Sequence, residues 1–369
     1  MRITEIRATT CDVPLPRPII MGDLRYDSRE YLLVEIATDT GHTGIGFGMT
    51  RGSPTAAIVA RSLSPLLLGQ DPLLTEAVWE RLYYRNLPIG QRGIFMRALS
   101  AVDIALWDLK GQAAGLPVWR LLGGARTNVP AAMAGGYPAS DRTLMDLERE
   151  LADYVARGFR FVKIAAGDLA EDTARLEASR RAVGPDIALA YDAHWAWRSL
   201  LAVVPTVRTW SGLDLAFIED PFPTESVASS ARLREQTGVR LALGEDVVGR
   251  WAFRDLLERV QPDVLRLDAT VAGGLSEAVK VCALAATLDV PVLPHVFPEV
   301  HVHLAAAFGA VMAVELTDPV HETESLHRLF RRWVDVRDGQ LVAPEDPGLG
   351  VAFDPDAVER HATERFVSS

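Results

Sequence analysis

The chain has 369 residues, a formal net charge of −11 and 49% hydrophobic residues, which is the composition of a globular protein. The negative charge argues against nucleic acid and anionic lipid as partners, and no apolar run reaches the roughly 20 residues of a membrane span. Two cysteines, Cys11 and Cys282, are too few for a disulfide framework, and the N-terminus lacks the pattern of a signal peptide. We therefore expect a cytoplasmic protein.

The first third of the sequence predicts a mixed α+β domain. Residues 31–48 alternate around a Thr-Asp-Thr-Gly turn, which is the pattern of an antiparallel hairpin. Apolar residues then recur at helical spacing in three segments, 53–67, 73–85 and 93–115. We predict that this domain covers residues 1–125.

From about residue 128, short apolar runs alternate with polar segments of helical period. The eight runs read VPAAMAGG, RFVKIA, IALAYDAH, LAFIEDP, RLALGED, DVLRLDAT, VPVLPH and MAVELT. Strands that alternate with helices predict an α/β fold, a parallel (β/α)8-type barrel, which we place at residues 126–325. Residues 326–369 lose this rhythm, and we expect them to return to the first domain.

Seven of the eight runs end on an ionisable residue. In chain order these residues are Lys163, Asp192, Glu219, Glu245, Asp268, His295 and Glu315. The C-terminal ends of barrel strands meet at one mouth, so we expect these side chains to surround one pocket. Unpaired charge is costly at buried strand ends, so such a series indicates an active site. His194 lies two residues after Asp192 and should line the same pocket, because residues i and i+2 of a strand share a face.

Lysine is rare in this chain, which makes Lys163 conspicuous. The other lysines are Lys110 and Lys280, and the remaining 35 of the 38 basic residues are arginine. A compact ammonium can stabilise a negative charge that develops on a substrate, and its pKa can fall far enough for it to act as a base. Arginine offers only the first of these properties.

These motifs resemble the enolase superfamily, in particular its mandelate racemase-like branch, over nearly the whole chain. The N-terminal domain matches the family's capping domain in SREYLLVEIATDTGHTGIGFG and ALSAVDIALWDLKGQAAGLPVWRLLGG, and the tail matches in PGLGVAFDPDAVERH. YDAH, FIEDP and LGED resemble the family's three metal-ligand strands, and RLDAT and LPHVF resemble its Asp–His pair. The resemblance implies a (β/α)7β-type modified TIM barrel whose capping domain is completed by the C-terminal tail.

The resemblance also implies a role for each strand-end residue. Asp192, Glu219 and Glu245 would bind Mg2+, an ion that favours carboxylate oxygen ligands. Asp268 would orient His295 as the catalytic acid/base. Glu315 would contact the carboxylate end of the substrate.

At the second strand the sequence departs from the branch, which usually carries Lys-x-Lys with the second lysine as a base. Here the motif is Lys163-Ile164-Ala165, so the position of that base holds alanine. The retained Lys163 matches the lysine that lies beside the substrate carboxylate, and we expect it to act electrostatically. The third strand carries His194 where the branch often has asparagine, and we predict that His194 contacts the substrate.

Other polar and aromatic residues receive separate interpretations. The segment 19–30 matches the loop that closes over substrate in the family, so Arg25, Tyr26 and Asp27 are candidates to bind distal hydroxyls. Trp195 and Trp197 are interpreted as packing residues, and His301 and His303 as structural residues at a helix start. Relatives commonly form dimers or octamers, so a homo-oligomer is expected.

The predicted chemistry is Mg2+-dependent removal of the α-proton of a carboxylate through an enediolate. The favoured reaction is dehydration of a sugar acid to a 2-keto-3-deoxy acid, because one acid/base can both remove the α-proton and protonate the departing hydroxyl. Racemisation or epimerisation usually needs bases on opposite faces, and the alanine at position 165 counts against it. Cycloisomerisation of a sugar lactone also runs on few bases. A metal-binding barrel without turnover is the alternative from another class.

Overall fold

An antiparallel sheet forms the base of the N-terminal part of the molecule. The computed structural model describes residues 1–21, 24–139, 142–320 and 325–369. The strands of this sheet lie in the order β16-β1-β2-β3. Their bounds are β1 (Ile3–Met21), β2 (Leu24–Thr38), β3 (Thr43–Met49) and β16 (Ala362–Ser368). β2 and β3 pair antiparallel and form the hairpin that was predicted over residues 31–48.

Helices cover one side of this sheet, and all of them except α5 lie within the three predicted segments of helical spacing. They are α1 (Thr55–Ile58), a π-helical turn (Val59–Leu63), α2 (Ser64–Leu67), α3 (Thr75–Arg85), α4 (Ile94–Ala114) and the short α5 (Val118–Leu121). α4 lies directly against β3. Gly44 and Gly46 permit this approach, because a Cβ at either position would collide with backbone atoms of α4.

The barrel contains the eight strands that the apolar runs predicted. They are β4 (Asn128–Gly135), β5 (Phe161–Ala165), β6 (Ala188–Asp192), β7 (Leu215–Glu219), β8 (Leu241–Leu243), β9 (Val264–Leu267), β10 (Val292–Pro294) and β11 (Val314–Thr317). They pair in parallel from β10 back to β4, and β11 pairs with β4 on its other edge. Next to β11, β10 forms an isolated parallel bridge, in which Val292 donates its N–H to Ala310 and accepts the N–H of Met312, two residues that precede β11. The fold is therefore the predicted (β/α)8-type barrel with an N-terminal α+β domain.

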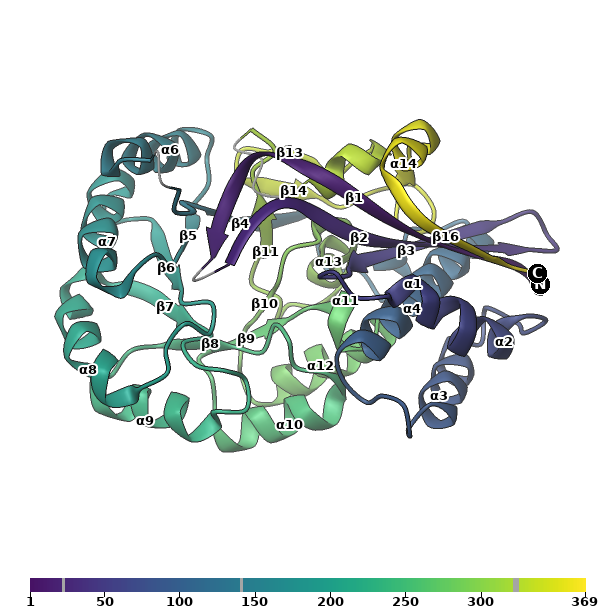
Figure 1. Cartoon of the computed structure of the whole chain (residues 1–369), viewed down its shortest axis with the longest axis horizontal. Coiled ribbons are helices and arrows are strands. Elements are labelled where there is room, and N and C mark those ends of the chain that lie inside the picture. Colours follow the sequence, from purple (N-terminus) through teal and green to yellow (C-terminus); the bar gives the residue numbers. More distant parts are fainter. Residues whose placement is uncertain (22–23, 140–141, 321–324) are drawn as a thin grey trace.

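Each connection between consecutive barrel strands contains a helix. These helices are α6 (Leu144–Ala156), α7 (Leu169–Val183), α8 (Leu200–Thr209), α9 (Val227–Thr237), α10 (Gly249–Arg259), α12 (Leu275–Thr287), which follows the one-turn α11 (Ala269–Ala272), and α13 (Pro298–Ala307). A 3-10 turn (Trp210–Leu213) follows α8. In Figure 1, α6 to α10 form an arc outside the strands.

A layer of apolar side chains fills the barrel interior below the polar strand ends. It consists of Ala132, Phe161, Ala190, Phe217, Ala242, Val264, Leu293 and Ala313. Side chains two residues further along a strand point the same way. Lys163, Asp192 and Glu219 follow Phe161, Ala190 and Phe217 at that distance, so strand alternation turns them into the barrel above its apolar floor.

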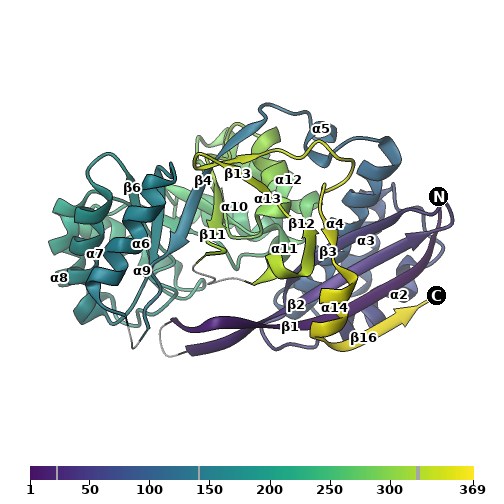
Figure 2. The same ribbon diagram turned by 90° about the horizontal axis from the view of Figure 1, so that it is seen from above.

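The C-terminal segment contacts both parts of the molecule. After a 3-10 turn (Leu326–Leu329) it forms β12 (Phe330–Arg332), β13 (Asp335–Arg337), β14 (Gln340–Val342), β15 (Ala352–Phe353) and α14 (Pro355–His361) before β16. β14 first pairs antiparallel with β4 of the barrel, and β16 then joins β1 of the N-terminal sheet. The tail thus completes the N-terminal sheet after a detour along the barrel (Figure 2). The domain boundaries at residues 125 and 325 stay a prediction.

The paired ends of β1 and β2 extend beyond α4 toward the barrel (Figures 1 and 2). Among the described residues, no helix is both long and apolar enough to span a bilayer.

Candidate active site

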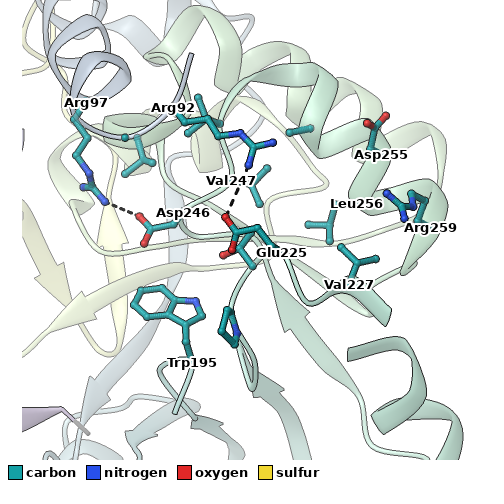
Figure 3. Close-up of a pocket in the computed structure, with 16 residues that line it drawn as sticks. Arg92, Arg97, Trp195, Glu225, Val227, Asp246, Val247, Asp255, Leu256 and Arg259 are labelled. Carbon is teal, nitrogen blue, oxygen red and sulfur yellow. Dashed lines mark hydrogen bonds and ion pairs between the residues drawn. The ribbon is translucent and has the colours of Figure 1, made fainter. Parts of the chain in front are cut away.

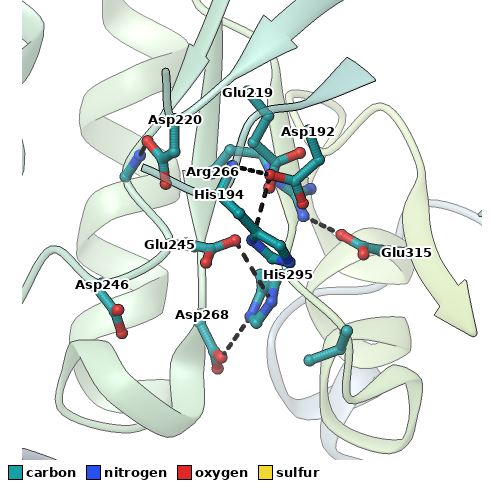
Figure 4. Close-up of polar contacts among 12 residues, drawn as sticks. Asp192, His194, Glu219, Asp220, Glu245, Asp246, Arg266, Asp268, His295 and Glu315 are labelled. Carbon is teal, nitrogen blue, oxygen red and sulfur yellow. Dashed lines mark hydrogen bonds and ion pairs between the residues drawn. The ribbon is translucent and has the colours of Figure 1, made fainter. Parts of the chain in front are cut away.

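Three carboxylates converge at the C-terminal end of the barrel. Asp192 and Glu219 are the last residues of β6 and β7, and Glu245 lies two residues beyond β8. All three are buried, and one ligand atom from each lies within 4.8 Å of the others (Figure 4). Glu245 reaches this position because Gly244 has φ +127°, a conformation that L residues rarely adopt, and so interrupts the alternation of the strand.

The carboxylates fit a divalent cation. Glu245 is 1% exposed, and within the described residues neither of its carboxylate oxygens accepts a hydrogen bond. Burial, and then the charges of Glu219 and Asp192, raise the pKa of Glu245 well above its ordinary value. A buried carboxylate without a donor requires a proton or a cation, and three oxygen ligands leave room for water and substrate on Mg2+. These residues are therefore the candidates to hold a metal ion.

Lys163 lies beside this cluster and contacts three carboxylates. Its Nζ is 3.0 Å from an oxygen of Asp192, of Glu219 and of Glu315. Burial by itself lowers the pKa of Lys163. The three carboxylates raise it by more than burial lowers it, so the pKa lies well above its usual value. An ammonium has three N–H donors, and each has a carboxylate acceptor here. This arrangement favours a permanent cation over a base.

Arg266 is a further charged residue of the site that was not predicted from the sequence. It lies inside β9, two residues before Asp268. Its guanidinium is fully buried; Nε lies 2.8 Å from Glu219 Oε1, and Nη2 pairs with Glu315 Oε2. Nη1 donates to the carbonyl of Leu293 at 2.7 Å. The available signal was an arginine within the otherwise apolar run VLRL.

Lys163, Glu219, Arg266 and Glu315 form a closed ring of alternating charges. Glu315 has one oxygen on each cation, and although burial raises the pKa of Glu315, Arg266 and Lys163 hold it well below its usual range. The carboxylate of Glu315 is thus fixed as an anion. Its contact with substrate stays a prediction.

Asp268 and His295 form a hydrogen-bonded pair. Nδ1 of His295 lies 2.9 Å from Asp268 Oδ2, and Thr270 donates its backbone N–H and its hydroxyl to Asp268 Oδ1 at 2.7 Å. Burial has the largest single effect on the pKa of Asp268 and raises it, but the hydrogen bond and charge of His295 and the other neighbouring groups together outweigh burial and lower the pKa. An ionised Asp268 can only accept, so Nδ1 carries the imidazole proton. Nε2, which lies 3.4 Å from Glu245 Oε2, is then the basic nitrogen at the carboxylate cluster.

His194 also lies at this mouth. Its side chain is 8% exposed, its Nδ1 is 3.4 Å from Asp192 Oδ1, and among the described residues neither ring nitrogen has a hydrogen-bond partner. Burial lowers the pKa of His194 to about 4, which keeps the ring neutral. A neutral imidazole has one hydrogen-bond donor and one acceptor, and a substrate hydroxyl can pair with either of them.

The residues predicted from the segment 19–30 lie on the projecting end of β2. Arg25 is exposed and its Nη2 lies 2.8 Å from Asp27 Oδ1. The guanidinium of Arg29 lies 4.7 Å from the ring centroid of Tyr26. Substrate binding by Arg25, Tyr26 and Asp27 stays a prediction.

Several loops that follow these strands carry backbone strain. Of the ten described non-glycine residues with positive φ, five lie in these loops, namely His194 (50°), Trp195 (54°), Asp220 (34°), Val296 (41°) and Phe297 (45°). Such conformations cost about 1–3 kcal/mol each and cluster at functional sites. Three of the loops around this mouth are therefore held in unfavourable geometry.

A separate recess of about 680 Å3 lies between the start of α4 and the loops after β6, β7 and β8 (Figure 3). Arg97 of α4 pairs there with Asp246 at 2.5 Å, and Trp195 lines the wall. None of the three converging carboxylates lines it, so this recess is not the candidate active site. Trp197 packs against Tyr191 and Phe222, as a packing residue should.

Two known domain families match this chain. Residues 4–123 match the mandelate racemase / muconate lactonizing enzyme N-terminal domain, and residues 146–357 match the enolase C-terminal domain-like family. The chain belongs to the enolase superfamily, in its mandelate racemase-like branch. This confirms the resemblance drawn from the strand-end motifs.

Several relatives of this chain are named for reactions of sugar acids or sugar lactones. The chain is 32% identical to arabinonate dehydratase of Saccharolobus solfataricus, over 90% of each chain. It is 34% identical to D-galactarolactone cycloisomerase of Agrobacterium fabrum, over 97% of this chain and 98% of the relative. The crystal structure of L-talarate dehydratase from Polaromonas sp. JS666 in complex with Mg and L-glucarate superposes with a TM-score of 0.89. That pair is 29% identical over 100% of this chain and 99% of the other.

Proposed function

We propose that this enolase-superfamily protein dehydrates a sugar acid, an aldonate or aldarate, to the 2-keto-3-deoxy acid. The observation that carries the proposal is the Asp268–His295 pair, whose basic Nε2 lies 3.4 Å from Glu245. Asp192, Glu219 and Glu245 would hold Mg2+, which supplies Lewis-acid stabilisation of the negative charge on the substrate carboxylate.

In this proposal His295 does both proton transfers. Its Nε2 takes the α-proton, and the electron pair of the C–H bond becomes part of the enediolate. As the β-carbon–oxygen bond breaks, the protonated imidazole returns its proton to the departing hydroxyl, which leaves as water. The resulting enol tautomerises to the 2-keto acid. Asp268 keeps Nδ1 protonated throughout and stabilises the imidazolium.

Lys163 supplies fixed positive charge near the developing dianion. Its three donors already face carboxylates, so a second base at this position would first have to leave its partners. This supports a one-base reaction over epimerisation. His194 is proposed as a substrate contact because its ring nitrogens are unpartnered among the described residues.

Cycloisomerisation of a sugar lactone is the second candidate. It is favoured by the 34% identity to a galactarolactone cycloisomerase, and it also needs only one base. The two reactions differ in substrate and leaving group. Dehydration expels the β-hydroxyl of an open-chain acid as water, whereas cycloisomerisation expels the ring oxygen of a lactone and releases no water.

A screen of aldonates, aldarates and their lactones with Mg2+ tests the proposal, with 2-keto acid formation as the readout and His295→Asn as the control. We expect keto product from at least one acid sugar and none with the variant. Keto product from a lactone but from no open-chain acid would favour the cycloisomerase. Tight Mg2+ binding with no reaction in the whole library would favour a metal-binding barrel without turnover.

A further inference from the structure

His301 connects the two loops that carry the catalytic pair. It lies in the first turns of α13 and is fully buried. Its Nε2 accepts the backbone N–H of Ala269 at 2.9 Å, and its Nδ1 lies 2.6 Å from the carbonyl oxygen of Val296. Ala269 follows Asp268, and Val296 follows His295. One imidazole therefore bridges the residues directly after both members of the pair.

The tautomer of His301 follows from these contacts. A nitrogen that accepts an N–H cannot itself carry a proton, so Nε2 of His301 is unprotonated. The carbonyl of Val296 can only accept, so Nδ1 carries the proton and donates it. Nε2 lies 3.9 Å from Asp268 Oδ1, and because it bears a lone pair it gives that carboxylate no ion pair. The carboxylate of Asp268 is therefore stabilised by hydrogen bonds from His295 and Thr270.

The bridged backbone on the His295 side is strained. Val296 has φ +41° and Phe297 has φ +45°. A β-branched residue at positive φ is a genuine outlier, and it persists only where neighbouring contacts hold it. The carbonyl of Val296 accepts from His301, and the carbonyl of Phe297 accepts from the N–H groups of Val300 and His301 at 3.1 Å. α13 and His301 together retain the turn that aims His295 into the mouth.

We propose that His301 is a positioning residue for the Asp268–His295 pair. It sets the separation of the loops after β9 and β10, so that the basic nitrogen of His295 faces the carboxylate cluster. The proposal rests on the role of His295 in the proposed function. It assigns His301 no contact with substrate.

The chain offers a matched control on the same helix. His303 is equally buried and also bridges two backbone groups, because Nδ1 accepts the N–H of Trp119 and Nε2 faces the carbonyl of Leu349, both at 3.1 Å. Its partners belong to α5 and to the C-terminal segment, outside the mouth of the barrel. A purely structural role would make the two histidines equivalent.

The test compares His301→Leu and His303→Leu, with His301→Asn and His301→Gln as partial replacements. Asn places a donor near the position of Nδ1, and Gln places an acceptor near the position of Nε2. We expect both Leu variants to lose stability by a similar amount. Only His301→Leu should lower kcat, by about 10–100-fold as for small misplacements of reacting groups, with KM and Mg2+ affinity unchanged. The Asn and Gln variants should lie between His301→Leu and the native protein.

A second readout needs neither substrate nor metal. Proton NMR of the metal-free protein should show a His295 Nδ1–H resonance that exchanges slowly with solvent, identified by its loss in His295→Asn. Exchange should accelerate in His301→Leu and not in His303→Leu. Equal effects of the two Leu variants on kcat and on this resonance would overturn the proposal. If His301→Leu does not fold, the Asn and Gln variants carry the same comparison, and native values in both would overturn it.

The two readouts separate this inference from the proposed function. A native protein that forms no product from any acid sugar or lactone would contradict the proposed function. The exchange rate of the His295 proton would still report whether His301 holds the pair.

Discussion

At the residue scale, the contacts of Lys163 explain why an arginine-rich chain keeps a lysine there. The ammonium donors point in three tetrahedral directions, and three carboxylates from β6, β7 and β11 receive them. A guanidinium is planar and directs its donors within one plane, which suits Arg266 between two carboxylates and a carbonyl. The two cations are therefore not interchangeable.

Replacing Glu245 with glutamine should remove metal affinity while the fold is retained. The substitution keeps the shape of the side chain and removes a buried charge that has no hydrogen-bond donor among the described residues. We expect Glu245→Gln to lose most Mg2+ binding in a calorimetric titration and nearly all turnover. Glu277→Gln is the matched control, because Glu277 is equally buried but pairs with Arg250 outside the site. Undiminished activity after thorough chelation would contradict the metal assignment.

Exchange of the α-proton in D2O should reveal whether Lys163 is a base. If His295 works alone, the enediolate is reprotonated only from the face that lost the proton, so NMR should detect no α-epimer. Lys163→Met should slow α-proton exchange and dehydration in parallel, by roughly 10²–10³-fold for the loss of one electrostatic donor. An inverted epimer that the native protein forms and Lys163→Met does not would make Lys163 a second base and the protein an epimerase.

At the element scale, α4 connects the N-terminal sheet to the barrel and the tail. Asp108 accepts the backbone N–H groups of Ile45 at 2.9 Å and Leu349 at 2.7 Å. Asp103 accepts the N–H and the hydroxyl of Ser276 at the start of α12, at 2.9 and 2.7 Å. Single side chains of one helix thus fix three segments that are distant in the sequence.

Asp103 should make stability depend on pH. Burial raises the pKa of Asp103 from 3.8 to about 7, with the two hydrogen bonds from Ser276 opposing the shift. A raised pKa in the folded state means that the contribution of Asp103 to stability is present below pH 4 and is lost as the pH rises through 7. Relative to Asp103→Asn, the native protein should lose up to about 4 kcal/mol of unfolding free energy across this range.

Urea denaturation at pH 4 and pH 8 spans this range and measures the difference. The exposed Asp186→Asn is the control and should follow the native protein at both pH values. A constant difference between the native protein and Asp103→Asn would mean that Asp103 is ionised in the folded state throughout.

At the scale of the whole molecule, the barrel mouth concentrates negative charge that a cation should stabilise. Mg2+ should raise the melting temperature, because an ion at 100 times its dissociation constant adds about 2.7 kcal/mol to the folded state. Glu245→Gln should show little shift with Mg2+, and without the ion it should melt no lower than the native protein. Scanning calorimetry with and without chelator measures the melting temperatures of the native protein and the variant. A native melting temperature that does not change with saturating Mg2+ would contradict the metal site.

The sequence alone was sufficient for the barrel strands and for most of the ionisable residues around the barrel mouth. Apolar runs that end on a charged residue every 20 to 29 positions are a local pattern, and parallel strands carry their C-terminal ends to the same place. Lys163, Asp192, Glu219, Glu245, Asp268, His295 and Glu315 are therefore brought together as expected, while their catalytic and binding roles stay predictions.

The remaining features depend on contacts between segments far apart in the chain. Arg266 pairs with Glu219 and Glu315, 47 and 49 residues away, and His301 bonds Ala269, 32 residues away. β14 pairs with β4 before the tail reaches the N-terminal sheet. Periodicity records which face of a strand or helix is buried, but not which partner a buried polar group meets. That choice is made by tertiary packing, because a buried donor or acceptor must be satisfied by whichever group the fold brings within hydrogen-bonding distance.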